Sequence, residues 1–104
     1  MNTPRLRLKP KDRKLQILDA MLAEAEATGY TRVTREAIAT RAACSPNLVS
    51  NYFKTMPQLR RTLMRNAVRQ ERLKIIAEGV VLKDPHALEA PEELRKRALA
   101  AAGA

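Results

Sequence analysis

The sequence predicts an all-α protein, and three observations predict it. Its 104 residues are rich in alanine, leucine, arginine and glutamate, which favour helix, and only Tyr30, Tyr52 and Phe53 are aromatic. Apolar residues recur at the spacing of one helix face, whereas no segment alternates apolar and polar residues as a half-buried strand does. Cap residues precede several of these segments. A chain of this length forms about one domain with one modest core.

The first helix is expected from Lys11 to Thr28. Its apolar residues recur every three or four positions and form one stripe that should face the core: Leu15, Leu18, Met21, Leu22 and Ala25. Gly29 follows directly and suits the C′ position, where the chain leaves a helix with a positive φ.

Two short helices are expected next, over residues 35–42 and 46–53. Thr34 is the N-cap of the first, and Glu36 lies in its first turn, where negative charge is favoured. Ser45 is the N-cap of the second, and Pro46 occupies its first position, where a missing N–H costs nothing. A tight connection of about three residues therefore separates the two helices.

A longer fourth helix is expected from a capping box at Thr55 and Gln58 to about Glu78, where Gly79 would end it. Its apolar side would comprise Leu59, Leu63, Val68, Leu73 and Ile76. Two further short helices begin at Asp84-Pro85 and at Pro91-Glu92-Glu93. The expected organisation is a flexible basic arm over 1–10, a helix-turn-helix module over 11–56, a helical extension for dimerisation over 57–101, and a tail over 102–104.

The net charge of +9 is the strongest indication of function. A charge of this size suits nucleic acid, an anionic membrane or an acidic protein as partner. The excess lies in two stretches, because residues 1–14 carry six bases and one acid, and residues 31–75 carry ten bases and two acids. The first stretch is either a solvated tail or an arm that orders on a polyanion, with bases that include Arg5, Arg7, Lys9 and Lys11.

A cytoplasmic protein is expected. The single cysteine, Cys44, excludes an internal disulfide and fits a reducing compartment. No apolar run approaches the roughly 18 residues of a membrane span. The basic N-terminal residues are not followed by the apolar stretch of a signal peptide.

Residues 35–53 meet the physical requirements of a helix-turn-helix unit. Ala39 is small enough for the second helix to cross the first, and the turn holds Ala43, with Cys44 placed to fill the core. Three apolar residues of the second helix would face inward: Leu48, Val49 and Phe53. Five short polar or rigid residues near its start would face outward and read base edges in the major groove: Ser45, Pro46, Asn47, Ser50 and Asn51.

Residues 17–59 resemble the DNA-binding module of TetR-type transcriptional regulators. The matching features have ungapped spacing: Ile17-Leu18, Gly29-Tyr30, Thr34, Ile38-Ala39, the Ala-Cys-Ser turn, Tyr52-Phe53 and Leu59. The resemblance implies that the helix from Pro46 is the recognition helix and that Tyr52, Lys54 and the start of the fourth helix contact the DNA backbone. The full set of expected backbone contacts is Arg32, Thr34, Arg35, Tyr52, Lys54, Arg60 and Arg61.

The sequence departs from that family at three positions and in length. Ala43 stands where glycine is usual, Ser50 where tyrosine is usual, and Met56 where lysine is usual. Regulators of this type add a large helical domain for inducer and dimer contacts, whereas only about 45 residues follow Leu59. We expect these residues not to wall a ligand cavity of a few hundred Å³, and hence expect no small-molecule ligand.

Four arginines of the expected fourth helix recur at spacings of four, four and three and share one face: Arg61, Arg65, Arg69 and Arg72. Three interpretations stay open, namely a solvated face, a ridge that contacts phosphates, or a ridge that pairs with a partner subunit's acids, such as Glu71 or Glu78. Only the first turns of this helix can approach DNA docked on the preceding helix, which favours Arg60 and Arg61 as phosphate contacts.

The sequence offers little for catalysis or metal binding. His86 is the only histidine and Cys44 the only cysteine, so they cannot supply the usual ligands of a structural zinc site. The three glycines lie too far apart for a phosphate-binding loop. We therefore expect no enzyme, no cofactor and no metal.

The leading hypothesis is a small sequence-specific DNA-binding transcriptional regulator, a repressor or an activator. It would bind double-stranded DNA as a homodimer, with a dimer surface drawn from residues 62–101. Two alternatives stay open: a non-specific architectural protein that binds nucleic acid by charge, and an adaptor whose basic face binds an acidic protein. A short regulator without a sensor domain would suit a phage or another mobile element.

Overall fold

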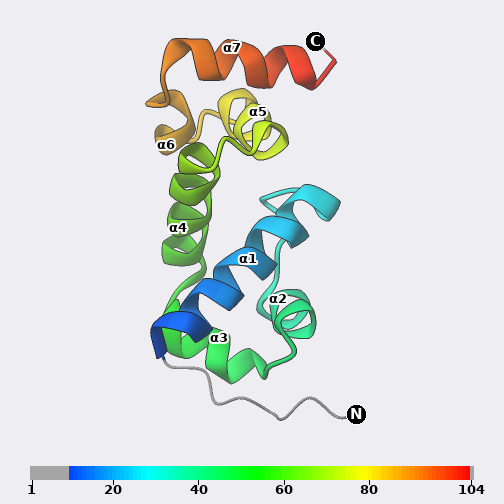
Figure 1. The fold of residues 1–104 in the computed structure, drawn as a ribbon, viewed down its shortest axis with the longest axis vertical. Coiled ribbons are helices and arrows are strands. Elements are labelled where there is room, and N and C mark those ends of the chain that lie inside the picture. The colour runs from blue at the N-terminus through cyan, green and yellow to red at the C-terminus, as the bar shows by residue number, and fades with distance from the viewer. Residues whose placement is uncertain (1–9, 104) are drawn as a thin grey trace.

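The computed structural model describes residues 10–103, and this range forms seven helices and no strand. The expected all-α fold is confirmed. In chain order (Figure 1) the helices are α1 (Pro10–Thr28), α2 (Arg35–Ala42), α3 (Pro46–Tyr52), α4 (Met56–Arg69), α5 (Leu73–Val81), α6 (Pro85–Leu88) and α7 (Glu92–Ala101).

Helix α4 runs between two groups of helices (Figure 1). Helices α1, α2 and α3 gather around its first turns, whereas α5, α6 and α7 pack at its other end. The molecule is elongated, with principal extents of 45 × 31 × 21 Å. We refer to the two groups as the α1–α3 end and the α5–α7 end.

Side-chain caps begin three helices where the sequence predicts them. Each cap hydroxyl accepts a backbone N–H three residues on, at 3.1–3.2 Å: Thr34 from Ala37, Ser45 from Leu48, and Thr55 from Gln58. The capping box predicted at Thr55 and Gln58 differs from the standard motif in one bond. Gln58 Oε1 accepts the N–H of Lys54 (3.1 Å) instead of that of Thr55. Caps of this kind stabilise a helix by about 1 kcal/mol each, so local chemistry fixes where α2, α3 and α4 begin.

The core of the α1–α3 end extends into α4. Its fully buried side chains include Ile17, Met21, Leu22, Ile38, Val49, Phe53, Leu59 and Leu63. The stripe predicted for α1 is wrong at its first position, because Leu15 is 52% exposed. The buried face of α1 runs through Ile17, Leu18 and Met21, and helical geometry leaves Leu15 at the edge of that face.

The prediction of one fourth helix to about Glu78 is wrong. Helix α4 ends at Arg69, and α5 begins at Leu73 after a turn in which Glu71 adopts a left-handed φ of 54°. The turn is a Schellman motif, because the N–H of Arg72 donates to the Ala67 carbonyl (2.8 Å) and that of Glu71 to the Val68 carbonyl (3.2 Å). No glycine or proline marks this turn. The break instead lets Ile75 and Ile76 of α5 reach the core, where both are fully buried.

Gly79 does not end a helix, and this prediction is also wrong. It lies inside α5 and is buried. A Cβ at this position would stand 2.5 Å from Met64 Cε of α4 and 2.7 Å from Ala87 Cβ of α6. Glycine is therefore required here because α4, α5 and α6 meet at this point, not because the chain turns.

Polar contacts join the C-terminal end of α1 to α5. Arg72 pairs with Glu26 at 2.9 Å, and Glu78 Oε1 accepts the N–H of Tyr30 at 3.1 Å, just after the positive φ of Gly29. The Tyr30 hydroxyl donates to Asp84 Oδ2 at 3.5 Å. Burial, and next the nearby Asp84 carboxylate, raises the pKa of this phenol. Tyr30 therefore stays neutral at physiological pH and remains a donor between the two ends.

Candidate nucleic-acid interface

Helices α2 and α3 pack against each other across a three-residue turn, Ala43 to Ser45. Ala43 adopts φ 55° and ψ 46°, in the left-handed region. The N–H of Cys44 donates to the Ala39 carbonyl (2.9 Å) and that of Ala43 to the Thr40 carbonyl (3.3 Å), which makes a Schellman motif. Cys44 packs against the core from the turn, as predicted, although it is only partly buried.

Helix α3 separates its apolar and polar side chains. Val49 and Phe53 are buried, while Leu48 and Tyr52 are partly buried and pack against the core. The five residues predicted to read bases lie on the other side, where Ser50 is half-buried and the rest are exposed: Ser45, Pro46, Asn47 and Asn51. The structure therefore leaves the predicted reading residues accessible on the monomer.

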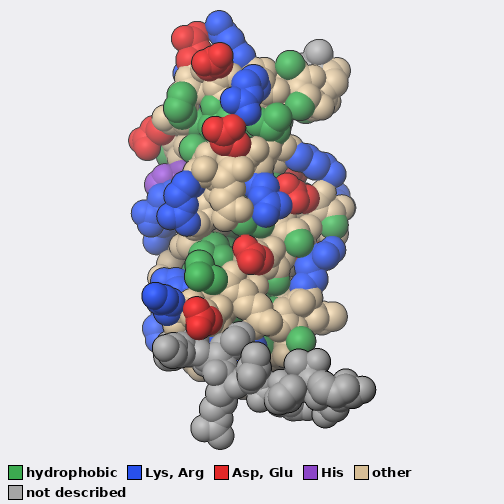
Figure 2. Space-filling model, in the orientation of Figure 1, with side chains coloured by type: hydrophobic (Ala, Val, Ile, Leu, Met, Phe, Trp, Pro, Cys, Tyr) green, Lys and Arg blue, Asp and Glu red, His purple; other side chains and the backbone are tan. Residues whose placement is uncertain are grey.

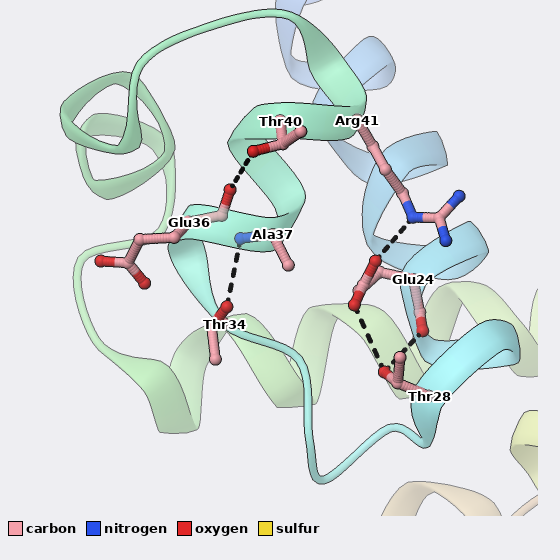
Figure 3. A network of polar contacts seen from close by, with 7 residues as sticks. All are labelled: Glu24, Thr28, Thr34, Glu36, Ala37, Thr40 and Arg41. Carbon is pink, nitrogen blue, oxygen red and sulfur yellow. Dashed lines mark hydrogen bonds and ion pairs between the residues drawn. The ribbon is translucent and has the colours of Figure 1, made fainter.

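A polar network fastens α2 to α1 and so fixes the direction of α3 (Figure 3). Arg41 Nε pairs with Glu24 Oε1 at 2.6 Å, and Thr28 Oγ1 donates to the backbone carbonyl of Glu24 at 2.9 Å. At the other end of α2, the Thr34 cap holds the first turn. Arg41 therefore already pairs with an acid of the same chain, although it is one of the basic residues nearest α3 in sequence.

Several predicted backbone contacts line one shallow hollow of about 360 Å³ beside the first turns of α2 and α4. They are Arg32, Thr34, Arg35 and Arg60, and the wall also includes Thr31, Val33, Glu36 and Met56. Arg35 also donates from Nη2 to the Lys54 carbonyl at 3.2 Å, so the start of α2 lies next to the link between α3 and α4.

Two guanidinium nitrogens at this hollow lack partners among the described residues. Arg35 Nε and Arg60 Nε are buried and donate to no acceptor within residues 10–103. A buried N–H without a partner costs about 1–3 kcal/mol. An anion in the hollow could supply acceptors to both arginines.

The remaining predicted contacts flank α3. Lys54 and Arg61 are exposed, and Tyr52 is half-buried at the last position of α3. Lys11 is exposed on α1, whereas Arg5, Arg7 and Lys9 of the predicted arm lie outside the described residues.

Sequence reasoning missed one basic residue near α3, Lys14 of α1. Its Nζ lies 5.9 Å from the centroid of the Phe53 ring, a cation–π distance. Helical spacing offered the signal, because Lys14 precedes the buried Leu18 by one turn, so its stem lies along the edge of the core.

The face of four arginines does not exist as predicted. Arg72 lies beyond the end of α4 and pairs with Glu26 of the same chain. Arg69 is exposed and donates to Asn66. The acids proposed for a partner subunit have partners within the chain, since Glu71 pairs with Arg97 at 2.8 Å and Glu78 accepts from Tyr30. Arg61, Arg65 and Arg69 remain on α4, each one turn from the next, and all three are exposed.

Helices α3 and α4 contain no acidic residue, because none occurs between Glu36 and Glu71. On the face shown in Figure 2, acidic side chains occur both at the α5–α7 end and toward the α1–α3 end. Residues 10–69 nevertheless carry eleven bases against five acids, and this surplus favours an anionic partner at the α1–α3 end.

A second, larger hollow of about 650 Å³ lies between α1, α5 and α7. The C-terminal end of α1 supplies one of its walls, so the residues after Leu59 do not wall it alone, and the expectation of no small-molecule ligand stays a prediction. None of the helices within residues 10–103 has both the length and the apolar character that crossing a bilayer requires.

Comparison of the sequence with protein-family models gives no match, and comparison with curated proteins gives none either.

Proposed function

We propose that this protein is a sequence-specific DNA-binding regulator of the TetR type and that α3 is its recognition helix. One observation carries the proposal: α3 buries Val49 and Phe53 and leaves uncharged polar side chains exposed around its start. A helix that bound only by charge would need lysine or arginine at these positions. Short uncharged groups suit hydrogen bonding to base edges.

The dimensions of α3 fit the major groove. An α-helix with its side chains is about 10–12 Å across, and the groove is about 12 Å wide. The amides of Asn47 and Asn51 can each bond adenine at N6 and N7, and Ser50 can bond several bases. The Ser45 oxygen accepts the N–H of Leu48, but its hydroxyl hydrogen remains available for donation.

The arginine hollow would hold a phosphate next to the bases that α3 reads. Arg32, Arg35 and Arg60 line the hollow, and their guanidinium groups would supply charge and N–H donors to phosphate oxygens. Tyr52 at the end of α3, and Lys54 and Lys14 beside it, would reach neighbouring phosphates. These contacts fix the register of α3 on the duplex but carry no sequence information themselves.

The test is selection of bound duplexes from a random pool, followed by binding measurements at fixed salt. Asn47→Ala and Asn51→Ala should each weaken binding to the selected site by about 1–3 kcal/mol and relax the preference at one base pair. Gln70→Ala, an exposed amide beyond the end of α4, is the matched control and should leave both unchanged. Retention of the full site preference by both asparagine variants would refute the assignment of α3.

A second candidate function is binding of duplexes by charge alone. The exposed Arg61 and Arg65, one turn apart on α4, favour it. It predicts that the pool yields no preferred sequence and that affinity falls steeply with salt, by about 0.9 in log–log slope per phosphate contacted. An acidic protein partner, the third alternative, would compete with DNA for the same arginines.

A further inference from the structure

Two asparagines form the outward face of α3. Val49, in the middle of the helix, is fully buried. Asn47 lies two residues before Val49 and Asn51 two residues after it, and two residues of an α-helix correspond to a rotation of about 200°. Both asparagines therefore lie on the side opposite the core, and both are exposed. Ser50 is only one residue from Val49, so it lies at the edge of this face and is half-buried.

Helix α3 lacks the side chains that usually specify G·C pairs. Arginine or lysine donates to O6 and N7 of guanine, and aspartate or glutamate accepts from N4 of cytosine. None of these four residue types occurs from Ser45 to Phe53, the N-cap and the C-cap of α3. Lys54 follows the helix, because the backbone has already become extended at Phe53, with φ −130° and ψ 95°. The outward face of α3 therefore carries amides and hydroxyls only.

We propose that α3 is specific for A·T pairs and that the DNA sequence under it contains two of them, one contacted by Asn47 and one by Asn51. This inference rests on the proposed function. An asparagine amide matches adenine, because its Nδ2 donates to N7 and its Oδ1 accepts from the N6 amine. No other single base presents an acceptor beside a donor in the major groove, since guanine presents two acceptors there.

The geometry of α3 also limits the distance between the two A·T pairs. Asn47 and Asn51 are four residues apart, which corresponds to about 6 Å along the helix axis. Successive base pairs are about 3.4 Å apart along the duplex. A helix that is inclined to the duplex axis covers less of that axis than its own length. The two A·T pairs therefore lie at most about two base pairs apart.

Ser50 should tolerate more than one base. Its hydroxyl can donate or accept, so it can bond to the edges of several bases. Because it lies at the edge of the face that Asn47 and Asn51 form, it would contact a pair beside theirs. The sequence under α3 should therefore consist of two fixed A·T pairs with less specified neighbours.

The test is selection from a pool of random duplexes by the full chain and by three variants, Asn47→Arg, Asn51→Arg and Gln70→Arg. The unmodified protein should select two A·T pairs at most about two base pairs apart. Asn47→Arg and Asn51→Arg should each replace a different one of these pairs with G·C, because a guanidinium donates to O6 and N7 of guanine. Gln70→Arg adds the same charge at an exposed position beyond the end of α4 and should select the original sequence.

A base analogue in the selected duplex isolates the adenine contact. The deaza analogue of adenine that lacks the N7 acceptor still pairs with thymine. At each of the two positions it should weaken binding of the unmodified protein by about twofold to tenfold, as expected for one lost hydrogen bond. Asn47→Ala should no longer respond to the analogue at one position, and Asn51→Ala should no longer respond at the other. A merely structural role of the asparagines would not produce this pairing of residue and position.

Two results would overturn the inference. One is a selected sequence in which the specified pairs are all G·C, and the other is a pair of arginine variants that keep both A·T pairs of the unmodified protein. Circular dichroism shows whether the variants fold, which the exposure of Asn47 and Asn51 favours. Failure of the proposed function is distinguishable, because the pool would then yield no preferred sequence even with the unmodified protein, and the inference would fall with it.

Discussion

The α1–α3 end and the α5–α7 end of this molecule are both small helical groups on one α4, yet they leave opposite surfaces uncovered. The first, with α4, carries a net charge of +6 over residues 10–69 and exposes short polar side chains on α3. The second is neutral over residues 70–104 and exposes Val81 and Leu82 beside a hollow. The charge of the first end suits an anionic partner, whereas the second end leaves apolar side chains uncovered.

The largest expected effect tests whether the two ends fold as one unit. Phe53→Ala removes a fully buried ring from α3 and should lower the free energy of unfolding by about 3–5 kcal/mol. Because Leu59 and Leu63 of α4 belong to the same core, both ends should unfold in one transition, followed by urea and circular dichroism. Leu15→Ala, at an exposed position, should change the free energy of unfolding by less than about 0.5 kcal/mol.

Hydrogen exchange would sharpen that comparison. If the amides of Ile75 and Ile76 in α5 keep their full protection in the Phe53→Ala variant, the two ends are independent units, contrary to our expectation.

The next effect concerns the contact among α4, α5 and α6. Gly79→Ala would place a Cβ 2.5 Å from Met64 Cε and 2.7 Å from Ala87 Cβ, and the overpacking should cost about 1–3 kcal/mol of stability. Val81→Ala, at an exposed position in the same helix, is the control for stability in urea unfolding. A Gly79→Ala protein with unchanged stability would mean that Met64 and α6 can shift to admit the Cβ without a loss of folding free energy.

Local chemistry explains what the sequence could predict. Starts of helices were predictable at both ends, because Thr34, Ser45 and Thr55 accept backbone N–H groups three residues on, and Asp84 caps α6 in a similar way. The break in the helix after Arg69 was not predictable, because Glu71 adopts a left-handed φ although it is not a glycine. The break is stabilised by the burial of α5 in the core, which local sequence does not indicate. The prediction that Gly79 ends a helix failed for the same reason, because the residues that require a glycine there, Met64 and Ala87, are distant from it in sequence.

For the candidate interface, exposure could be predicted but geometry could not. Periodicity placed Asn47 and Asn51 outward and Val49 inward on α3, and the burial agrees. The hollow that joins Arg35 and Arg60 requires the fold, because α2 and α4 meet there only in three dimensions. Whether this surface binds DNA stays a prediction.

An intermediate effect separates the phosphate-holding arginines from the rest of α4. Arg60→Ala should weaken DNA binding by about 1 kcal/mol on every duplex and reduce the salt slope by about 0.9, as expected for one lost phosphate contact. Arg65→Ala is the matched control, because Arg65 lies farther along α4 and does not line the hollow. Binding titrations at several salt concentrations measure both. A larger loss for Arg65→Ala would place the nucleic acid on the side of α4 instead.

The smallest expected effect is a gain in stability that both ends should share. Ala43 after α2 and Lys83 after α5 occupy the same position of a Schellman motif, with φ values of 55° and 62°. A left-handed conformation costs an L-residue about 1–2 kcal/mol, and a glycine would remove this cost. Glycine also gives the unfolded chain more freedom, which cancels about 0.4–1 kcal/mol of that gain in stability. Ala43→Gly and Lys83→Gly should therefore each stabilise the protein by roughly 0.5–1 kcal/mol.

Thermal and urea unfolding measure this gain, and Ala37→Gly inside α2 serves as the control, since glycine there should cost about 1 kcal/mol. DNA affinity adds a second readout, because the turn at Ala43 sets the angle between α2 and α3. If Ala43→Gly stabilises the fold but weakens binding while Lys83→Gly changes stability alone, the alanine rigidifies the turn for recognition. Equal binding by both variants would instead assign Ala43 no role beyond ending α2.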